Sequence, residues 1–133
     1  MPSVVTDTHT LVWYLTRSPR LSSAAFQRMR ATVAGGDPLL IPTVCMVEIT
    51  YLVEKGRIPA AARDGLARHL DQPNSDLRLV PLDRGVAEAV GRIARDQIAD
   101  MPDRIIAATA LHLALPLVTR DRHIRASGIE TIW

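Results

Sequence analysis

Residues 3–7 read Ser-Val-Val-Thr-Asp, and residues 116–121 read Pro-Leu-Val-Thr-Arg-Asp. Each stretch is a short run of apolar and β-branched residues that ends at or beside an acid, Asp7 in the first and Asp121 in the second. Short apolar runs of this kind are typical of strands that are buried on both faces of a parallel sheet. If the two strands are neighbours, both carboxylates lie at the sheet edge where α/β proteins bind their ligands.

Further apolar runs alternate with stretches of helical character along the rest of the chain. We expect strands at residues 39–41, 77–80 and, at an edge of the sheet, 130–133. The expected helices cover residues 11–15, 22–33, 43–55, 59–70, 83–95 and 100–113. Strands that alternate with helices predict an α/β layer fold with a parallel sheet.

Length and composition are those of one globular domain over residues 1–133. The chain is 47 % hydrophobic with a mean hydropathy of +0.08, which argues against disorder. A single cysteine, Cys45, excludes a disulfide framework and a cysteine-based zinc cluster. The apolar runs are shorter than the roughly 18 residues of a membrane helix, and no signal-peptide pattern opens the chain. We therefore expect a cytoplasmic protein.

Arginine strongly outnumbers lysine among the basic residues. The formal net charge is only +2, but Lys55 is the only lysine among 16 basic residues. Arginine suits two-point contacts with phosphate better than lysine does, which fits a nucleic-acid substrate, although a general bias towards arginine explains the count equally well. Aromatic residues make up 4 % of the chain, too few for a platform on which bases stack.

Glu48 lies in the middle of the expected helix 43–55. Val44, Tyr51 and Leu52 stand four residues before it and three and four residues after it, so its carboxylate shares an apolar face. A buried carboxylate without a partner is costly. Either an arginine forms a salt bridge with Glu48 or a metal ion supplies the opposite charge.

Asp103 lies in the first turn of the expected helix 100–113. Asp100 in the N-cap position and an acid three residues later resemble a capping box, and both suit the helix dipole. However, Ile106, Ala107 and Ala110 share the helix face of Asp103, which turns that face towards the core. The alanines let this helix pack close to the sheet and bring its first turn near the strand ends.

Four acids could therefore converge on one site, namely Asp7, Glu48, Asp103 and Asp121. Close carboxylates repel one another unless a cation neutralises them. Oxygen ligands favour Mg²⁺ or Mn²⁺ over zinc, and such ions catalyse phosphodiester hydrolysis. The spacing of the four acids does not by itself establish this chemistry.

The sequence resembles the PIN domain, and specifically the VapC-type toxin ribonucleases of toxin–antitoxin pairs. The matching stretches are Val-Thr-Asp-Thr-His-Thr at 5–10, Val-Glu-Ile at 47–49, Asp-Arg-Ile-Ile-Ala-Ala-Thr-Ala at 103–110 and Leu-Val-Thr-Arg-Asp at 117–121. They occur in the family's order and span nearly the whole chain. The resemblance implies a three-layer sandwich with a five-stranded parallel sheet. Its strand order would be 3-2-1-4-5, with the first strand central and the fourth beside it.

The resemblance also implies a metal-dependent endoribonuclease. Asp7, Glu48 and Asp103 would hold the principal Mg²⁺, with Mn²⁺ able to replace it. Asp121 would complete the site and help to hold a second ion. Thr119 matches a hydroxyl residue that the family often has near its last acid, so it would support the site.

Five further residues are secondary candidates. Asp100 matches an acidic position that often precedes the third acid, although its proline falls one residue later here and a capping role explains it as well. Arg104, Arg120 and Arg122 stand beside proposed site acids and either bind substrate phosphates or are solvated surface charges. His9 either touches the substrate or orients a neighbouring side chain.

By resemblance, the partners are a small VapB-type antitoxin and an RNA substrate. The C-terminal segment of such an antitoxin wraps the toxin and blocks the acidic site, and the pair binds promoter DNA through the antitoxin. The toxin is commonly a homodimer. The helix expected at residues 59–70 and those before it offer apolar side chains for a partner groove or for the core, and we expect Trp13 in the core or at a dimer surface.

Three other functions remain to be weighed. A phosphoacceptor receiver domain requires paired acids after the first strand and a lysine near the fifth, but Lys55 is elsewhere. A haloacid-dehalogenase-like phosphatase requires an aspartate at position 9, where the chain has His9. The third is a PIN-like module that binds protein or RNA without catalysis, which the retention of all four acids disfavours.

Overall fold

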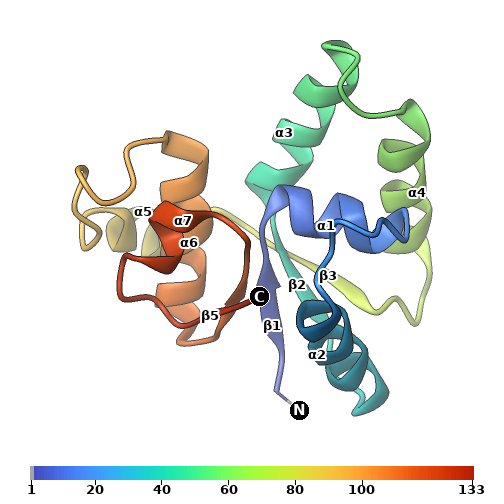
Figure 1. Ribbon diagram of the computed structural model, residues 1–133, viewed down its shortest axis with the longest axis horizontal. Helices are drawn as coiled ribbons and strands as arrows, with labels where there is room; N and C mark the ends of the chain where they lie inside the picture. The colour runs from blue at the N-terminus through green and yellow to red at the C-terminus, as the bar shows by residue number, and fades with distance from the viewer. Residues whose placement is uncertain (1) are drawn as a thin grey trace.

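Five short parallel strands lie at the centre of the computed structural model, which describes residues 2–133 (Figure 1). They are β1 (Val4–Thr6), β2 (Leu39–Pro42), β3 (Leu77–Val80), β4 (Leu117–Val118) and β5 (Thr131–Ile132). Their order is β3-β2-β1-β4-β5, and each neighbouring pair is parallel. Val5 pairs with Leu117 and Thr6 with Val118, so β1 and β4 end side by side. The α/β class and the strand order are confirmed.

Helices cover both faces of the sheet. The helices are α1 (Thr8–Leu15), α2 (Ser23–Ala34), α3 (Thr43–Glu54), α4 (Ala60–Asp71), α5 (Arg84–Val90), α6 (Met101–Leu113) and α7 (Arg122–Arg125). In Figure 1, α1 and α2 lie on one side of the strands, and α5, α6 and α7 lie on the other. The helices α3 and α4 form a pair that extends beyond the strand ends on the side of α1. This is the predicted three-layer arrangement.

A side-chain cap marks the first turn of every helix except α3 and α4, and some boundaries differ from those expected. The Asp7 carboxylate accepts a hydrogen bond from the Thr10 N–H, so α1 begins at Thr8, three residues earlier than the apolar pattern predicts. The helix α5 ends at Val90, before Gly91, rather than near residue 95. The four-residue helix α7 was not predicted, because one turn is too short to show a periodic pattern.

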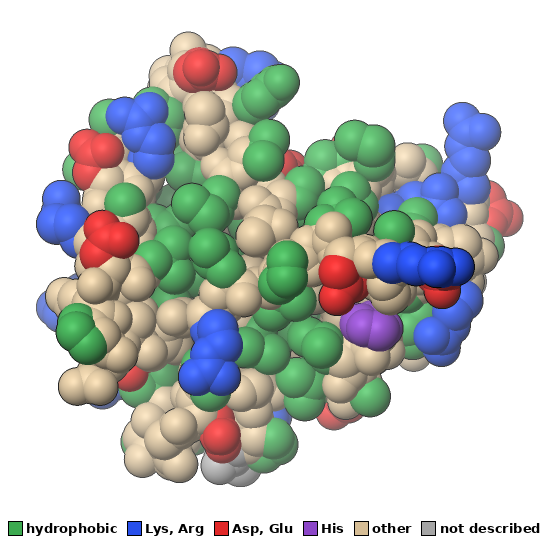
Figure 2. Space-filling model, turned by 180° about the vertical axis from the view of Figure 1, so that it is seen from behind, with side chains coloured by type: hydrophobic (Ala, Val, Ile, Leu, Met, Phe, Trp, Pro, Cys, Tyr) green, Lys and Arg blue, Asp and Glu red, His purple; other side chains and the backbone are tan. Residues whose placement is uncertain are grey.

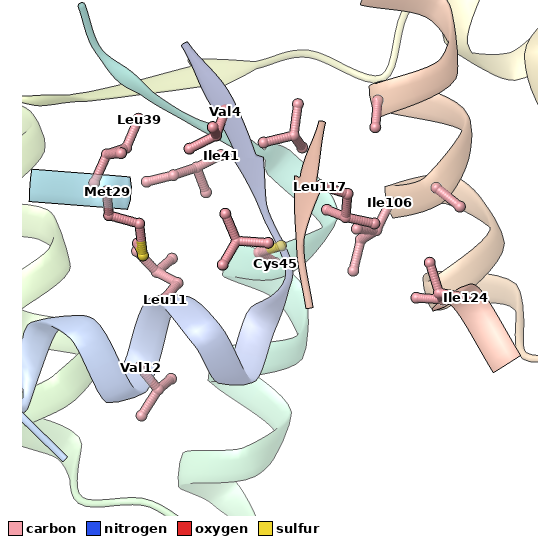
Figure 3. Close-up of a cluster of buried hydrophobic side chains, with 14 of the residues drawn as sticks. Val4, Leu11, Val12, Met29, Leu39, Ile41, Cys45, Ile106, Leu117 and Ile124 are labelled. Carbon is pink, nitrogen blue, oxygen red and sulfur yellow. The ribbon is translucent and has the colours of Figure 1, made fainter. Parts of the chain in front are cut away.

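The core lies on both sides of the sheet. Figure 3 shows Leu11 and Met29 on one side of the strands and Ile106 and Ile124 on the other, and all four side chains are buried. Ala107, Ala108 and Ala110 are also buried, so α6 packs closely against β1 as predicted. This close packing brings the first turn of α6 to the edge where β1 and β4 end.

Replacing a strand residue in this core is expected to cost stability without touching any charged group. Leu117 in β4 is fully buried, so Leu117→Ala should lower the free energy of unfolding by about 2–5 kcal/mol. The matched control is Leu82→Ala, because Leu82 is 46 % exposed and its truncation should change stability by less than about 0.5 kcal/mol. Urea denaturation followed by circular dichroism measures both, and equal losses would contradict this view of the core.

Candidate active site

An acidic cavity of about 390 Å³ lies where β1 and β4 end. Its lining consists of five acids together with polar, aromatic and basic side chains: Asp7, Thr8, His9, Trp13, Arg20, Glu48, Asp100, Asp103, Arg120 and Asp121. All four acids singled out in the sequence line this one cavity, and Asp100 lines it with them. They come from four different segments of the chain, which the sheet and its helices bring together.

Asp7 is fixed by hydrogen bonds to both of its carboxylate oxygens. One oxygen accepts the Thr10 N–H at 2.8 Å, and the other accepts the Thr119 hydroxyl at 2.5 Å. The same Thr119 oxygen accepts the N–H of Asp121 at 3.0 Å. Thr119, which is fully buried, therefore links the acids that follow β1 and β4.

Glu48 reaches the cavity from the middle of α3. Its carboxylate accepts a hydrogen bond of 2.6 Å from the hydroxyl of Thr8, a residue that is 3 % exposed. Within residues 2–133 the salt bridges are Arg63–Asp64 and Arg84–Glu88, so no arginine there neutralises Glu48. Burial raises the pKa of Glu48, the Thr8 hydrogen bond opposes this shift, and the Asp100 charge adds to it.

Asp103 carries the clearest electrostatic perturbation in the cavity. Burial, together with the negative charges of Asp100, Asp121, Glu48 and Asp7, raises its pKa to about 7. The Asp100 carboxylate also caps α6 by accepting the N–H of Asp103 at 3.1 Å. Asp100 thus fills the predicted capping role and faces the cavity as well.

Two arginines line the cavity without forming ion pairs with its acids. Arg20 and Arg120 are both exposed, and neither takes part in a salt bridge within the part of the chain that the structure describes. The guanidinium of Arg120 lies 4.8 Å from the ring centroid of Trp13. His9, also exposed, lies 5.7 Å from the same ring, centroid to centroid.

The other two candidate arginines lie outside the cavity. Arg104 donates hydrogen bonds to the backbone carbonyls of Val90 and Ile93 at 3.0 and 2.8 Å, so it fastens the end of α5 to α6. Arg122 lines a separate surface hollow beside His123. Being next to a site acid in sequence does not bring either side chain into the site, because neighbouring residues point in different directions.

Sequence reasoning missed Thr8 and Arg20. Thr8 follows Asp7 directly, but its partner Glu48 is 40 residues away, and only the packing of α1 against α3 reveals the contact. Arg20 lies in the turn after α1. No periodic or motif signal in the chain marks it as facing the acids.

The chemistry of the cavity fits a hard divalent cation. Its acids supply oxygen donors and carry no ionic partner among residues 2–133. Burial and the neighbouring carboxylates together raise the pKa of Asp103 to about 7. Within the same residues, no three His, Cys, Asp or Glu side chains are placed as ligands of a single ion. The carboxylates face a common space but stay apart, as like charges do. The match to a divalent cation therefore rests on the oxygen donors and on a negative charge that no salt bridge within residues 2–133 neutralises.

Comparison with known proteins gives consistent matches. The model of the family described as PIN domain matches residues 4–129. The chain is 30 % identical to a protein named Ribonuclease VapC22 from Mycobacterium tuberculosis (strain ATCC 25618 / H37Rv), and the match covers 100 % of both chains. No helix in residues 2–133 has the length and apolar character needed to cross a membrane.

Solved structures share the fold. One is the VapBC2 complex from Rickettsia felis bound to a DNA fragment from its promoter, with a TM-score of 0.72 at 16 % identity, covering 98 % of this chain and 97 % of that one. Another is the DNA-bound VapBC complex from Salmonella typhimurium, with a TM-score of 0.72 at 21 % identity and the same coverage.

The raised pKa of Asp103 predicts how stability depends on pH in metal-free buffer. The folded value of about 7 exceeds the unfolded value of about 3.9. The native state therefore keeps a proton that the unfolded state releases, and stability falls as the pH rises from about 4 to about 7. Asp103→Asn should flatten this fall and raise the melting temperature at about pH 8.

Thermal unfolding in EDTA at about pH 5.5 and about pH 8 measures the effect. Glu48 leaves a smaller fall of the same sign in the variant, because burial raises its pKa too. Asp96→Asn is the control, since Asp96 is exposed and lines a different hollow. If Asp103→Asn kept the wild-type pH dependence of stability, Asp103 would not be the group whose raised pKa causes it.

Proposed function

The chain belongs to the PIN domain family, and we propose that it is the toxin of a toxin–antitoxin pair, an endoribonuclease that requires Mg²⁺ or Mn²⁺. One observation carries the proposal: four carboxylates from separate segments line one cavity, and none of them forms a salt bridge with a basic side chain of residues 2–133. The full-length similarity to a protein named as a ribonuclease supports the nuclease activity. The acidic cavity supports the dependence on a metal ion.

In this proposal each acid has a definite role. Asp7, Glu48 and Asp103 would hold the principal ion, and Asp121 would complete the site. Such an ion, when bound, would supply an activated water and would stabilise the oxygen that leaves the phosphodiester. The hydrogen bonds from Thr119 and Thr8 keep Asp7 and Glu48 turned into the cavity, as groups that support metal ligands do.

In this proposal, metal binding depends on the protonation state of Asp103. Carboxylates must be deprotonated to bind a metal ion, and a pKa near 7 leaves Asp103 partly protonated at neutral pH. A bound cation offsets both the burial and the neighbouring charges that raise this pKa. Cleavage should therefore increase as the pH rises through the neutral range.

The main test of this function is cleavage by the wild-type protein and by variants of its acids. Asp7→Asn and Asp103→Asn should each abolish Mg²⁺- or Mn²⁺-dependent RNA cleavage and growth arrest, because each removes a proposed ligand charge. Circular dichroism should show that both variants keep the fold. Mapping 5′ ends in RNA from cells that express the wild type or Asp7→Asn would reveal the cleaved RNA and the site of cleavage.

The alternative is a PIN-like module that binds protein or RNA without catalysis. It predicts no metal-dependent cleavage by the purified wild type and no effect of Asp7→Asn. Cleavage that persists in Asp103→Asn, once contaminating nuclease is excluded, would remove that acid from the mechanism. The acidic cavity favours the enzyme, because uncompensated carboxylates serve no purpose in a binding module for polyanionic RNA.

We also propose that a VapB-type antitoxin is the partner of this chain, as in the complexes that share its fold. A cavity of about 660 Å³ lies between α1 and α2 and reaches α4 through His69. It shares Leu15 and His69 with a second cavity of about 410 Å³ along α4. Because Trp13 lines both the larger cavity and the acidic one, a segment bound there could continue to the acids.

A homodimer is the proposed form of the toxin, with promoter DNA bound only through the antitoxin. Val47 and Tyr51, one turn apart on α3, are 56 % and 59 % exposed, and such side chains suit a contact between subunits. Figure 2 shows hydrophobic side chains gathered near the centre of the rear face, with charged side chains mainly around them. We place the proposed activity in the cytoplasm, where RNA is available.

The proposal that the antitoxin binds in the larger cavity, between α1 and α2, can be tested at Phe26. This residue lines the cavity and is 44 % exposed. Phe26→Ala should weaken binding of the protein encoded by an adjoining antitoxin-like reading frame by about 30-fold, as removal of an aromatic contact residue does. Isothermal titration calorimetry measures the affinity. Leu82→Ala is the matched control because Leu82 is similarly exposed and lies outside both cavities. Equal affinities for the two variants would place the antitoxin elsewhere.

A further inference from the structure

Arg120 holds an unusual position in the acidic cavity. It shares the cavity with five carboxylates, yet among residues 2–133 it forms a salt bridge with none of them. Its guanidinium instead lies over the Trp13 ring, 4.8 Å from the ring centroid. An arginine on the face of a tryptophan forms a favourable cation–π contact. The positive charge is therefore held at the side of the cavity rather than among the acids.

Trp13 is itself firmly held. Its side chain is 8 % exposed and belongs to the hydrophobic core. The rings of Trp133 and His9 lie 5.8 and 5.7 Å from it, both in tilted orientations. Trp133 directly follows β5, which pairs with β4, the strand that leads to Arg120. A side chain fixed on several sides is a suitable platform for restraining a flexible arginine.

An RNA-cleaving site that is built from acids repels its own substrate, and the position of Arg120 reduces this repulsion. The RNA backbone is a polyanion, and the cavity that must receive it is lined by five acids. A guanidinium that is paired with those acids has fewer N–H groups to offer a phosphate, whereas one placed on an aromatic ring keeps its N–H edge available. Separating the arginine from the acids leaves it ready for substrate.

We propose that Arg120 binds a backbone phosphate of the RNA next to the cleaved bond and that Trp13 is the positioning residue that keeps it there. This inference rests on the proposed function and adds to it a residue for substrate binding and a means of holding it. Arg20 also lines the cavity, but the guanidinium stacked on Trp13 is that of Arg120.

Binding of a fluorescently labelled, short single-stranded RNA tests the proposal directly. Anisotropy is measured in EDTA, so that cleavage does not consume the probe, over a series of salt concentrations. Arg120→Gln should raise the Kd roughly tenfold, as expected for loss of a hydrogen bond to a charged group. It should also reduce the slope of log affinity against log salt by about 0.7, the value for one contact to a single-stranded phosphate.

Variants of the tryptophan test the positioning role. Trp13→Leu should raise the Kd nearly as much as Arg120→Gln, whereas Trp13→Phe keeps an aromatic face and should retain most of the affinity. The double variant Trp13→Leu/Arg120→Gln should bind no more weakly than Arg120→Gln alone, because Trp13 acts through Arg120. If Trp13→Leu unfolds, Trp133→Leu provides the same comparison at a less buried position. It should raise the Kd about twofold in the wild type and leave it unchanged with Arg120→Gln.

Arg57→Gln is the control for loss of one positive charge, because Arg57 is exposed in the turn after α3 and outside the acidic cavity. Equal Kd values and salt slopes for Arg120→Gln and Arg57→Gln would overturn the proposal. Additive effects of the tryptophan and arginine variants would overturn the role of Trp13.

The wild type is also assayed for cleavage with Mg²⁺. A protein that does not cleave RNA but whose binding depends on Arg120 would refute the nuclease function and not the phosphate contact.

Discussion

The parallel pairing of β1 with β4 is the constraint on which the site depends. It ends the two strands side by side, with Thr6 opposite Val118, and so sets Asp7 and Asp121 at one edge of the sheet. The buried hydroxyl of Thr119 then bonds to the Asp7 carboxylate and to the N–H of Asp121. Buried alanines let α6 pack closely against the sheet, and its first turn adds Asp103 to the same edge. Removing this pairing would separate the acids.

The same geometry also brings carboxylates together so that they repel one another, which is unfavourable for folding. Asp103 is partly buried among four other acids, and its pKa of about 7 measures the unfavourable free energy of its charged form. The chain provides hydroxyl groups at Thr8 and Thr119 that orient two carboxylates, but within residues 2–133 no ion pair neutralises them. A partly buried acidic cluster of this kind makes sense when function, rather than stability, requires it.

The sequence indicated most of the fold and much of the site, for identifiable reasons. Each strand is a short apolar run, so strand positions could be found, whereas the strand order came from the resemblance alone. Asp7 and Asp121 could be placed because they follow strands. The partner of Glu48 could not, because its contact with Thr8 depends on how two helices pack. Arg104 stands beside a site acid, but its helix turns the side chain towards Val90 and Ile93.

Trp13 connects features that the sequence shows only as separate residues. It lines both the acidic cavity and the larger cavity between α1 and α2, and the guanidinium of Arg120 stacks on its ring. A partner segment seated in the larger cavity would therefore contact the ring over which the guanidinium of Arg120 lies. If the proposed function holds, occupation of the larger cavity and the availability of Arg120 to RNA would then both depend on the Trp13 ring. Such a link needs no movement of Asp7 or Glu48, whose carboxylates are held by the hydroxyl groups of Thr119 and Thr8.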